Sequence, residues 1–424
     1  MLALLLAPQA LAVTVEEPWA AADANGKEAQ IIHEQRLQSD TLQTQAFALL
    51  SPKLVLGADY TVNEREVVLD FSQSIPEEFQ SFFEDTEPIV VNKKQYLSWN
   101  ASIIQPLFSG QAIPLYKGAV DIVKSGEAQE DHLRAQLRVG VARAWWGVVV
   151  AREGEKVAAG AVENARKHLQ IAETALAVGS VAPTVKLQAE LGVARAERQL
   201  AVAREQRAAV EEAFSRLTGL PPDSPTELPT ARVLPYQDVE TAVRRAVESR
   251  PDIRAAELQA SAGQMQAIAS KLAWLPSVDG RFTEAYTENS GFSGEPYNWQ
   301  LVFTAQWVLW DGGARVAEQA KAASGQRAAS YQVATLREQA EEAVRNLWHE
   351  RARAEIAVQA VAKEVQLASE NLRLAEVAFS AGTLSYLEVE DARLGYIAAT
   401  TTEVAEKMNL DLASIQLLQA TGDL

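Results

Sequence analysis

Cysteine is absent from the 424 residues of the chain. Its absence excludes disulfide bonds, zinc sites built from thiolates, and a lipid-carrying cysteine near the amino terminus. Basic residues are also outnumbered by acidic ones, which gives a formal net charge of -17. Because nucleic-acid binding relies on clusters of Lys and Arg, we exclude nucleic acid as a partner.

Signals of catalysis are scarce as well. The chain has no glycine-rich phosphate loop and no nucleophile elbow. Its histidines lie in helical stretches without the spacing of metal ligands; they are His33, His132, His168 and His349. We therefore predict that the protein is not an enzyme and has no catalytic residue, cofactor or metal site.

Long apolar runs are missing too. No stretch reaches the roughly 18 apolar residues that indicate a spanning helix, although a spanning strand needs only about 9 to 11 alternating residues. At the amino terminus, "MLALLLAPQALA" ends in a small-residue sequence that suits cleavage after Ala12. We predict a signal peptide over residues 1–12, despite its missing basic region; a short buried helix is the alternative.

The chain contains two copies of one long pattern. Residues 99–219 and 299–422 share landmarks at an offset that drifts only from 200 to 203. The paired residues include Trp99 and Trp299, Gly110 and Gly312, Arg143 and Arg345, Trp146 and Trp348, Gly179 and Gly382, and Thr218 and Thr421. A repeat of this length predicts two copies of one large structural unit.

Each copy begins with two segments in which apolar and polar residues alternate. The segments are 54–62, 97–107, 278–287 and 297–310, and their period of two predicts strands with one apolar face. We predict β-hairpins over residues 52–110 and 276–313; the first has the longer connection, which includes the acidic "PEEFQSFFEDTEP" and belongs on an exposed loop. Aromatic residues that suit the girdles of an outer-membrane barrel are Tyr60, Trp99, Tyr286, Trp299, Trp307 and Trp310. The core of a soluble β-sandwich is the alternative.

Proline-free stretches follow both hairpins. No proline occurs between Pro114 and Pro183 or after Pro296, so residues 115–178 and 314–381 each predict one helix of roughly 100 Å. Glycine then closes each helix, and a second helix returns antiparallel. We predict helical hairpins over 111–218 and 314–424, a proline-rich linker over 219–240, and helical segments over 13–51 and 241–275 before the two β-hairpins.

This duplicated order resembles the TolC-like outer-membrane efflux protein family, and so do "RPDI" at residues 250–253 and "GG" at 312–313. The resemblance covers the chain after the signal peptide. It implies a mainly α fold with a membrane β-barrel portion, in which a homotrimer contributes four strands per chain to a twelve-stranded barrel continued by an α-helical tunnel through the periplasm. It also implies outer-membrane lipid, a periplasmic adaptor protein and an inner-membrane transporter as partners.

Two acids stand apart on the second return helix. Glu388 and Asp391 are three residues apart and share a helix face. The resemblance implies that they line a narrow periplasmic mouth together with Thr184, where threefold repetition would favour cations and raise the carboxyl pKa values. An ordinary exposed helix face is the alternative. Leu384 and Val185 occupy positions where family members carry a closing Arg and Asp, so the closing bonds must differ here.

The turns between paired helices are the remaining candidates. The resemblance implies that both dock the helical hairpin of the adaptor; their residues are Val178, Gly179, Ser180 and Val181, and Ala381, Gly382, Thr383 and Leu384. Plain turn chemistry is the alternative. We thus predict a passive outer-membrane exit channel of a tripartite efflux pump or type I secretion system for drugs, metals or other substrates. A soluble periplasmic coiled-coil scaffold is the competing function.

Overall fold

The computed structural model describes residues 15–69, 89–224, 232–381 and 383–424. They form two compact units. The helical unit contains the described residues of 15–37, 125–256 and 332–424, and the sheet unit contains the described residues of 38–124 and 257–331. The predicted signal peptide and the acidic part of the first hairpin connection, residues 70–88, lie outside the described residues.

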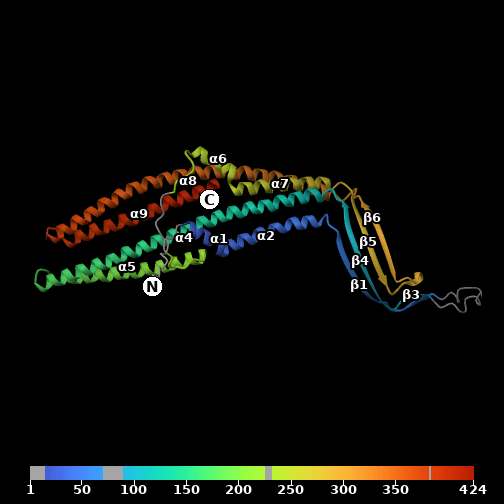
Figure 1. The fold of residues 1–424 in the computed structure, drawn as a ribbon, viewed down its shortest axis with the longest axis horizontal. Coiled ribbons are helices and arrows are strands. Elements are labelled where there is room, and N and C mark those ends of the chain that lie inside the picture. Colours follow the sequence, from blue (N-terminus) through green and yellow to red (C-terminus); the bar gives the residue numbers. More distant parts are fainter. Residues whose placement is uncertain (1–14, 70–88, 225–231, 382) are drawn as a thin grey trace, which may run out of the picture. The chain divides into compact units, whose positions relative to one another are not determined.

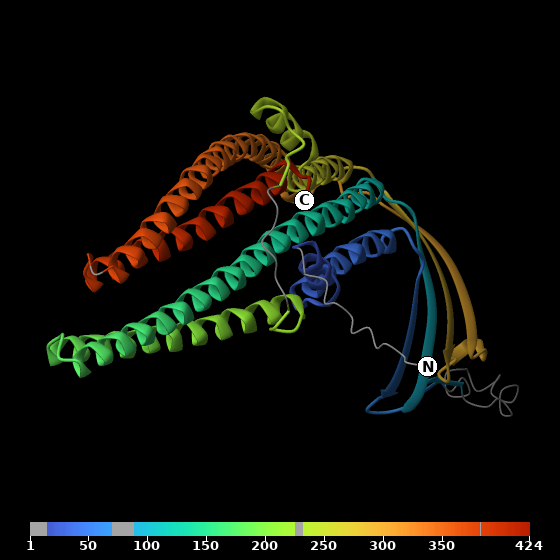
Figure 2. The ribbon, with the colours of Figure 1, turned by 60° about the vertical axis from the view of Figure 1, so that its left-hand side comes forward.

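The sheet unit is built on four antiparallel strands. They are β1 (Lys53–Val62), β4 (Gln95–Phe108), β5 (Ser277–Thr287) and β6 (Tyr297–Gln306), in the order β1-β4-β5-β6. Figure 2 shows these strands side by side, bending together along their length. The first pair and the last pair are the two predicted hairpins.

One predicted strand is too long. We expected the last strand to continue to Trp310, but β6 ends at Gln306. The indole N–H of Trp307 donates to the carbonyl oxygen of Trp274 at 3.0 Å, and the Asp311 carboxylate then accepts from the backbone N–H of Arg315 in the first turn of the next helix. Alternation in the sequence continues past the point where the backbone leaves the sheet, because exposed Trp and Leu residues follow directly.

The register of the sheet gathers the apolar side chains on one face. Residues that lie opposite one another across strands share a face, as in the row Leu54, Ile103, Phe282 and Leu301. On the other face, the hydroxyl groups of Ser102 and Thr283 lie 3.0 Å apart. The apolar face is open: Leu56 is 73% exposed and Phe303 is 67% exposed. The described residues therefore do not form the sandwich core considered as the alternative.

The longer connection of the first hairpin contains structure that the sequence did not predict. β2 (Val67–Leu69) and β3 (Ile89–Asn92) form a separate two-stranded sheet, and the short 3-10 helix η1 (Gly291–Ser293) lies in the second hairpin. Asn289 reaches from the second hairpin to the first, where its amide donates to the side-chain oxygen of Asn92 at 3.1 Å. The loops at this end of the sheet are thus tied to each other.

Long helices make up the rest of each repeat. α4 (Ala112–Ala177) pairs with α5 (Pro183–Thr218), and α8 (Ala314–Ser380) pairs with α9 (Tyr386–Thr421), as predicted (Figure 1). Shorter helices are α1 (Glu16–Asn25), α2 (Lys27–Ala48), α6 (Val239–Ser249) and α7 (Pro251–Leu272). No helix in the described part of the chain combines the length and low polarity needed to cross a membrane.

The helical segment expected over 241–275 consists of two helices. Arg250 has an extended backbone with ψ of 125°, since the ring of Pro251 disfavours the helical region for the residue before it. Arg250 then donates from Nε and Nη2 of its guanidinium to the two oxygens of the Asp252 carboxylate at 3.0 and 2.7 Å. The "RPDI" segment is therefore a helix break with a bidentate ion pair across it.

The two repeated tryptophans mark two cores of the helical unit. Trp146 is 1% exposed and packs with Trp145, Phe214 and Ile415, whereas Trp348 lies beside a cluster around Val344 and Leu417; both clusters use residues of α9. The indole N–H of Trp146 donates to Asp411 at 2.8 Å. Arg232 donates to the other oxygen of the same carboxylate at 3.0 Å. Burial raises the pKa of Asp411, and these two donors oppose that effect.

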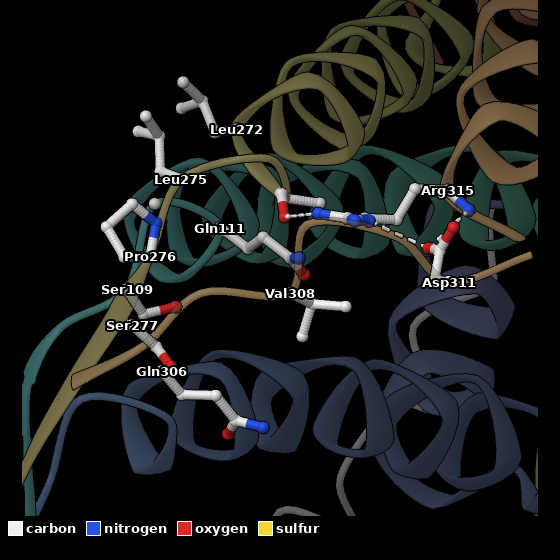
Figure 3. Close-up of a pocket in the computed structure, with 12 residues that line it drawn as sticks. Ser109, Gln111, Leu272, Leu275, Pro276, Ser277, Gln306, Val308, Asp311 and Arg315 are labelled. Carbon is white, nitrogen blue, oxygen red and sulfur yellow. Dashed lines mark hydrogen bonds and ion pairs between the residues drawn. The ribbon is translucent and has the colours of Figure 1, made fainter. Parts of the chain in front are cut away.

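A cavity of about 380 Å3 lies in the sheet unit where strands give way to helices (Figure 3). Arg315 lines it, donating to Asp311 at 2.8 Å and placing its guanidinium 4.2 Å from the ring centroid of Trp274. Gly110 closes another side, because a β-carbon there would lie only 2.6 Å from the carbonyl oxygen of Leu272. Because Arg315, the cation at the cavity, is already paired with Asp311, we assign the cavity a structural role.

Candidate functional site

The first candidate turn joins α4 to α5. Gly179 has φ of 74°, a left-handed conformation that other residues rarely adopt. It allows the backbone N–H and the hydroxyl group of Ser180 to donate to the Ala175 carbonyl oxygen at 2.9 and 2.8 Å. Pro183 then starts α5 without a side-chain cap. At the apex, Val178 is 75% exposed.

The second turn joins α8 to α9 by different chemistry. Thr383 donates its backbone N–H and its hydroxyl group to the Ala378 carbonyl oxygen, each at 3.0 Å. Leu384 packs beside the buried residues Val389 and Ala392. Ala381 is exposed, and Gly382, the remaining predicted contact residue, lies outside the described residues. Both turns lie at the same end of the helical unit (Figures 1 and 2).

Glu388 has a local structural role. Its carboxylate accepts from the backbone N–H of Ser385 at 2.9 Å and from the Ser385 hydroxyl group at 2.7 Å, which completes a capping box at the start of α9. These hydrogen bonds lower the pKa of Glu388, because they favour the charged form. The sequence predicted raised pKa values for the assembled acids; within one chain the effect on Glu388 is the reverse.

Asp391 lies one helical turn beyond Glu388, and both residues are exposed. Within the described residues, no hydrogen bond or ion pair joins Asp391 to a partner, and none joins Thr184 to either acid. No hydrogen bond or ion pair of the described residues therefore links the three predicted constriction residues inside a single chain. The structure leaves Asp391 as the acid without a capping role.

Sequence reasoning missed Arg393, which is 5% exposed on α9. Its guanidinium contacts His168 of α4 at 3.2 Å, Glu390 of α9 at 3.0 Å and Glu376 of α8 at 3.5 Å. No local pattern could have indicated this contact, because His168 and Arg393 are 225 residues apart. The capping box could have been found, since Ser385 and Glu388 have its S-x-x-E spacing.

The predicted barrel aromatics fall into two groups in the sheet unit. Trp99 stacks on Tyr286 with ring centroids 6.1 Å apart, and Tyr286 contacts Tyr297 at 4.9 Å. Tyr60, 65% exposed, donates from its hydroxyl group to Gln95, and Trp299 stacks on Phe282 with centroids 6.3 Å apart. Trp307 and Trp310 are exposed beyond the opposite end of β6 and are not strand residues.

The sequence profile of the family described as outer membrane efflux protein matches residues 33–220 and 242–423. The chain belongs to this family. The two matched regions cover both copies of the repeat, so the resemblance drawn from the sequence is confirmed. As a member of the outer membrane efflux protein family, the chain is an outer-membrane channel protein rather than an enzyme.

Solved structures agree with the family's fold. VceC of Vibrio cholerae is 18% identical, with a TM-score of 0.73 over 96% of this chain and 96% of VceC. CmeC of Campylobacter jejuni is 14% identical, with 0.75 over 96% and 85%. The open state of MtrE of Neisseria gonorrhoeae is 17% identical, with 0.74 over 96% and 88%. At such identities the likeness shows the fold alone. No curated protein matches the chain in sequence.

Proposed function

We propose that this efflux-family chain forms the outer-membrane exit channel of a tripartite efflux pump or a type I secretion system. The observation that carries the proposal is the sheet. It exposes an apolar face, and its outer strands β1 and β6 each have one edge unpaired within the described residues. Lipid does not tolerate unpaired backbone N–H and C=O groups, so the sheet requires further copies to close it.

Three copies satisfy this requirement. Pairing β6 of one chain with β1 of the next gives a closed barrel of twelve strands, which can enclose a bore, whereas the eight strands of a dimer are filled by their own side chains. The helical hairpins of three chains then continue the bore into the periplasm. The outer-membrane protein VceC and the outer-membrane channels CmeC and MtrE share this fold, which supports the proposal.

The channel is passive in this proposal, and an inner-membrane transporter supplies the driving force. The exposed turns are the docking points for a periplasmic adaptor protein. Because the chain has no cysteine, Val178→Cys creates a single cross-linking site at the first turn. We expect it to cross-link to an adaptor in intact cells. Val202→Cys, a 60% exposed position on α5 away from the turn, is the matched control and should not.

Glu388 and Asp391 are the proposed acidic ring at the periplasmic mouth, and Thr184 is the third proposed constriction residue. The structure supports separate roles: Glu388 stays ionised because the cap lowers its pKa, while Asp391 projects from the same face without a partner in the described residues. Three Asp391 carboxylates around a bore would attract cations. The ring thus depends on Asp391 more than the sequence indicated.

Conductance in planar bilayers tests the channel and the ring together. The purified chain should insert and conduct, whereas a soluble periplasmic scaffold would need no detergent and would conduct nothing. Asp391→Asn removes the charge and keeps the shape, so the preference for cations should fall. Glu350→Gln makes the same charge change at an exposed position of α8 outside the turns and serves as the control. Equal selectivity in both variants would eliminate the acidic ring and leave the channel itself intact.

A further inference from the structure

Arg393 joins the two helical hairpins of one chain near their turns. It belongs to α9, in the second hairpin, and its partner His168 belongs to α4, in the first. His168 lies nine residues before the end of α4, roughly 13 Å from it by helix geometry. The ring of Phe379 on α8 packs edge-on against the imidazole with centroids 6.1 Å apart. The contact therefore connects both hairpins just behind the turns.

The chemistry of the contact determines the protonation state of the histidine. A guanidinium group has donors only, so the Arg393 nitrogen at 3.2 Å must donate to a lone pair on Nε2 of His168. That lone pair exists only when the imidazole is neutral and carries its proton on Nδ1. A second proton, on Nε2, would remove the acceptor and place two cations against each other. The bond seen here is specific to neutral His168.

Acidic side chains complete the surroundings of this pair. Glu390 on α9 and Glu376 on α8 face Arg393. The charges of both glutamates also act to raise the pKa of His168. On α5, which pairs with α4, Glu197 is engaged by Arg166 of α4 at 2.7 Å. The glutamates balance the Arg393 charge from the second hairpin only. Among the described residues, His168 is thus the contact that holds the guanidinium to the first hairpin.

We propose that His168 and Arg393 form a proton-operated latch that holds the two hairpin turns of one chain together while His168 is neutral and releases them when it is protonated. Arg393 lies two residues beyond Asp391 on α9. In this scheme it acts as a positioning residue, because its contact with His168 holds this part of α9 against the first hairpin. Only the consequence for conductance rests on the proposed function. The latch itself is a contact within one chain.

The direction of the pH response follows from the local electrostatics. Burial and the neighbouring Arg393 charge lower the pKa of His168 from its ordinary value of 6.5. In a separated state the imidazole would regain its ordinary pKa. Well above pH 6.5 both states are neutral and the latch has its full strength; as the pH falls through 6.5, protons bind the separated state preferentially. Acid therefore favours separation of the hairpins.

Distance measurement between two spin labels tests the latch directly. The cysteine-free chain accepts labels at Val178→Cys and Leu387→Cys, which are 75% and 69% exposed and lie on the first and second hairpin. Labelled chain diluted with unlabelled chain reports distances within one molecule. We expect the distance to lengthen as the pH is lowered from about 8 to about 5, the range over which histidine changes charge.

Three variants test whether His168 causes this pH response. His168→Gln keeps an oxygen acceptor without a titrating group, so its distance should stay short at every pH. His168→Lys carries a permanent charge and should show the long distance already at the highest pH. His132→Gln removes another half-buried histidine of α4, whose pKa is also lowered by burial, and should respond like the parent chain. A pH response that survives in His168→Gln, or no response in the parent chain, would overturn the latch.

Conductance of the same samples separates this proposal from the previous one. If the distance responds to pH and no current flows, the latch stands and the channel proposal fails. If current flows but the distance is constant, the channel proposal stands and the latch fails. If current flows and the open probability rises over the same pH range as the distance, both the latch and the channel proposal are supported.

Discussion

Placing a charge at Leu301 tests whether the apolar face of the sheet meets lipid. Leu301 is the fifth of ten residues in β6, and Phe282 lies opposite it on β5. It is four residues from Tyr297 and five from Gln306, or roughly 13 and 17 Å along the strand at about 3.3 Å per residue. With a tilt of about 45°, these lengths correspond to depths of roughly 9 and 12 Å. In the proposed barrel, Leu301 would thus lie close to the middle of the hydrocarbon layer.

At that depth, Leu301→Arg should cost about 2–4 kcal/mol of stability per chain in a bilayer. In water, a substitution at this 52% exposed residue would change stability by no more than about 0.5 kcal/mol. Gln300→Arg is the matched control, because the neighbouring residue points to the polar face of the same strand. The two variants differ by one position and by the face of the sheet.

Urea titration of the protein in lipid vesicles measures the effect. Leu301→Arg should unfold at a clearly lower urea concentration than Gln300→Arg, and its trimer should dissociate at a lower temperature on gels. A similar shift in both variants would refute the lipid-facing assignment. Glu284 is a charged residue that the chain already has on the apolar face. It lies opposite Trp299, nearer the strand end, where a charge reduces stability less.

Other predictions concern the helical unit. Asp411→Ala removes the acceptor of the buried Trp146 and the half-buried Arg232 and should lower the free energy of unfolding by about 3–5 kcal/mol, measured by chemical denaturation. Ser385→Ala removes a helix cap and should cost about 1 kcal/mol in the same assay. Because the pKa of Glu388 is lowered from 4.5, the contribution of the cap is present above that pH and declines below it, so the difference from the parent should shrink in acid. Gly179→Ala forces a side chain into a left-handed residue and should destabilise the hairpin by about 1–2 kcal/mol, whereas the helical Gly192→Ala should be neutral or stabilising by calorimetry.

The repeated architecture was predictable because its signals are periodic and local. Alternation located all four long strands, and the absence of proline after Pro114 and Pro296 located the two longest helices. Errors arose where two signals conflicted. The apolar–polar alternation continues past Gln306, although the backbone leaves the sheet there. The helical segment predicted over residues 241–275 is interrupted at Pro251, because the proline itself breaks the helix.

The contacts near the turns were less accessible from sequence. The family resemblance identified Leu384 and Val185 as positions where the expected charged residues are missing. Arg393 was overlooked, because an arginine on an amphipathic helix is ordinarily solvated and only packing between distant segments buries it. The pKa of Glu388 depends on which donors face it, and the position of the carboxylate alone does not determine this.

The two unpaired edges of the sheet have a genetic consequence. In the proposed trimer, every chain offers β1 to one neighbour and β6 to the other. A mutant whose β6 edge cannot pair still presents an intact β1, so it is recruited by normal chains and prevents the ring from closing. Such an allele should act dominantly when expressed beside the normal gene, while an allele that prevents folding altogether should be recessive. Dominance would then identify the residues through which one subunit recognises the next.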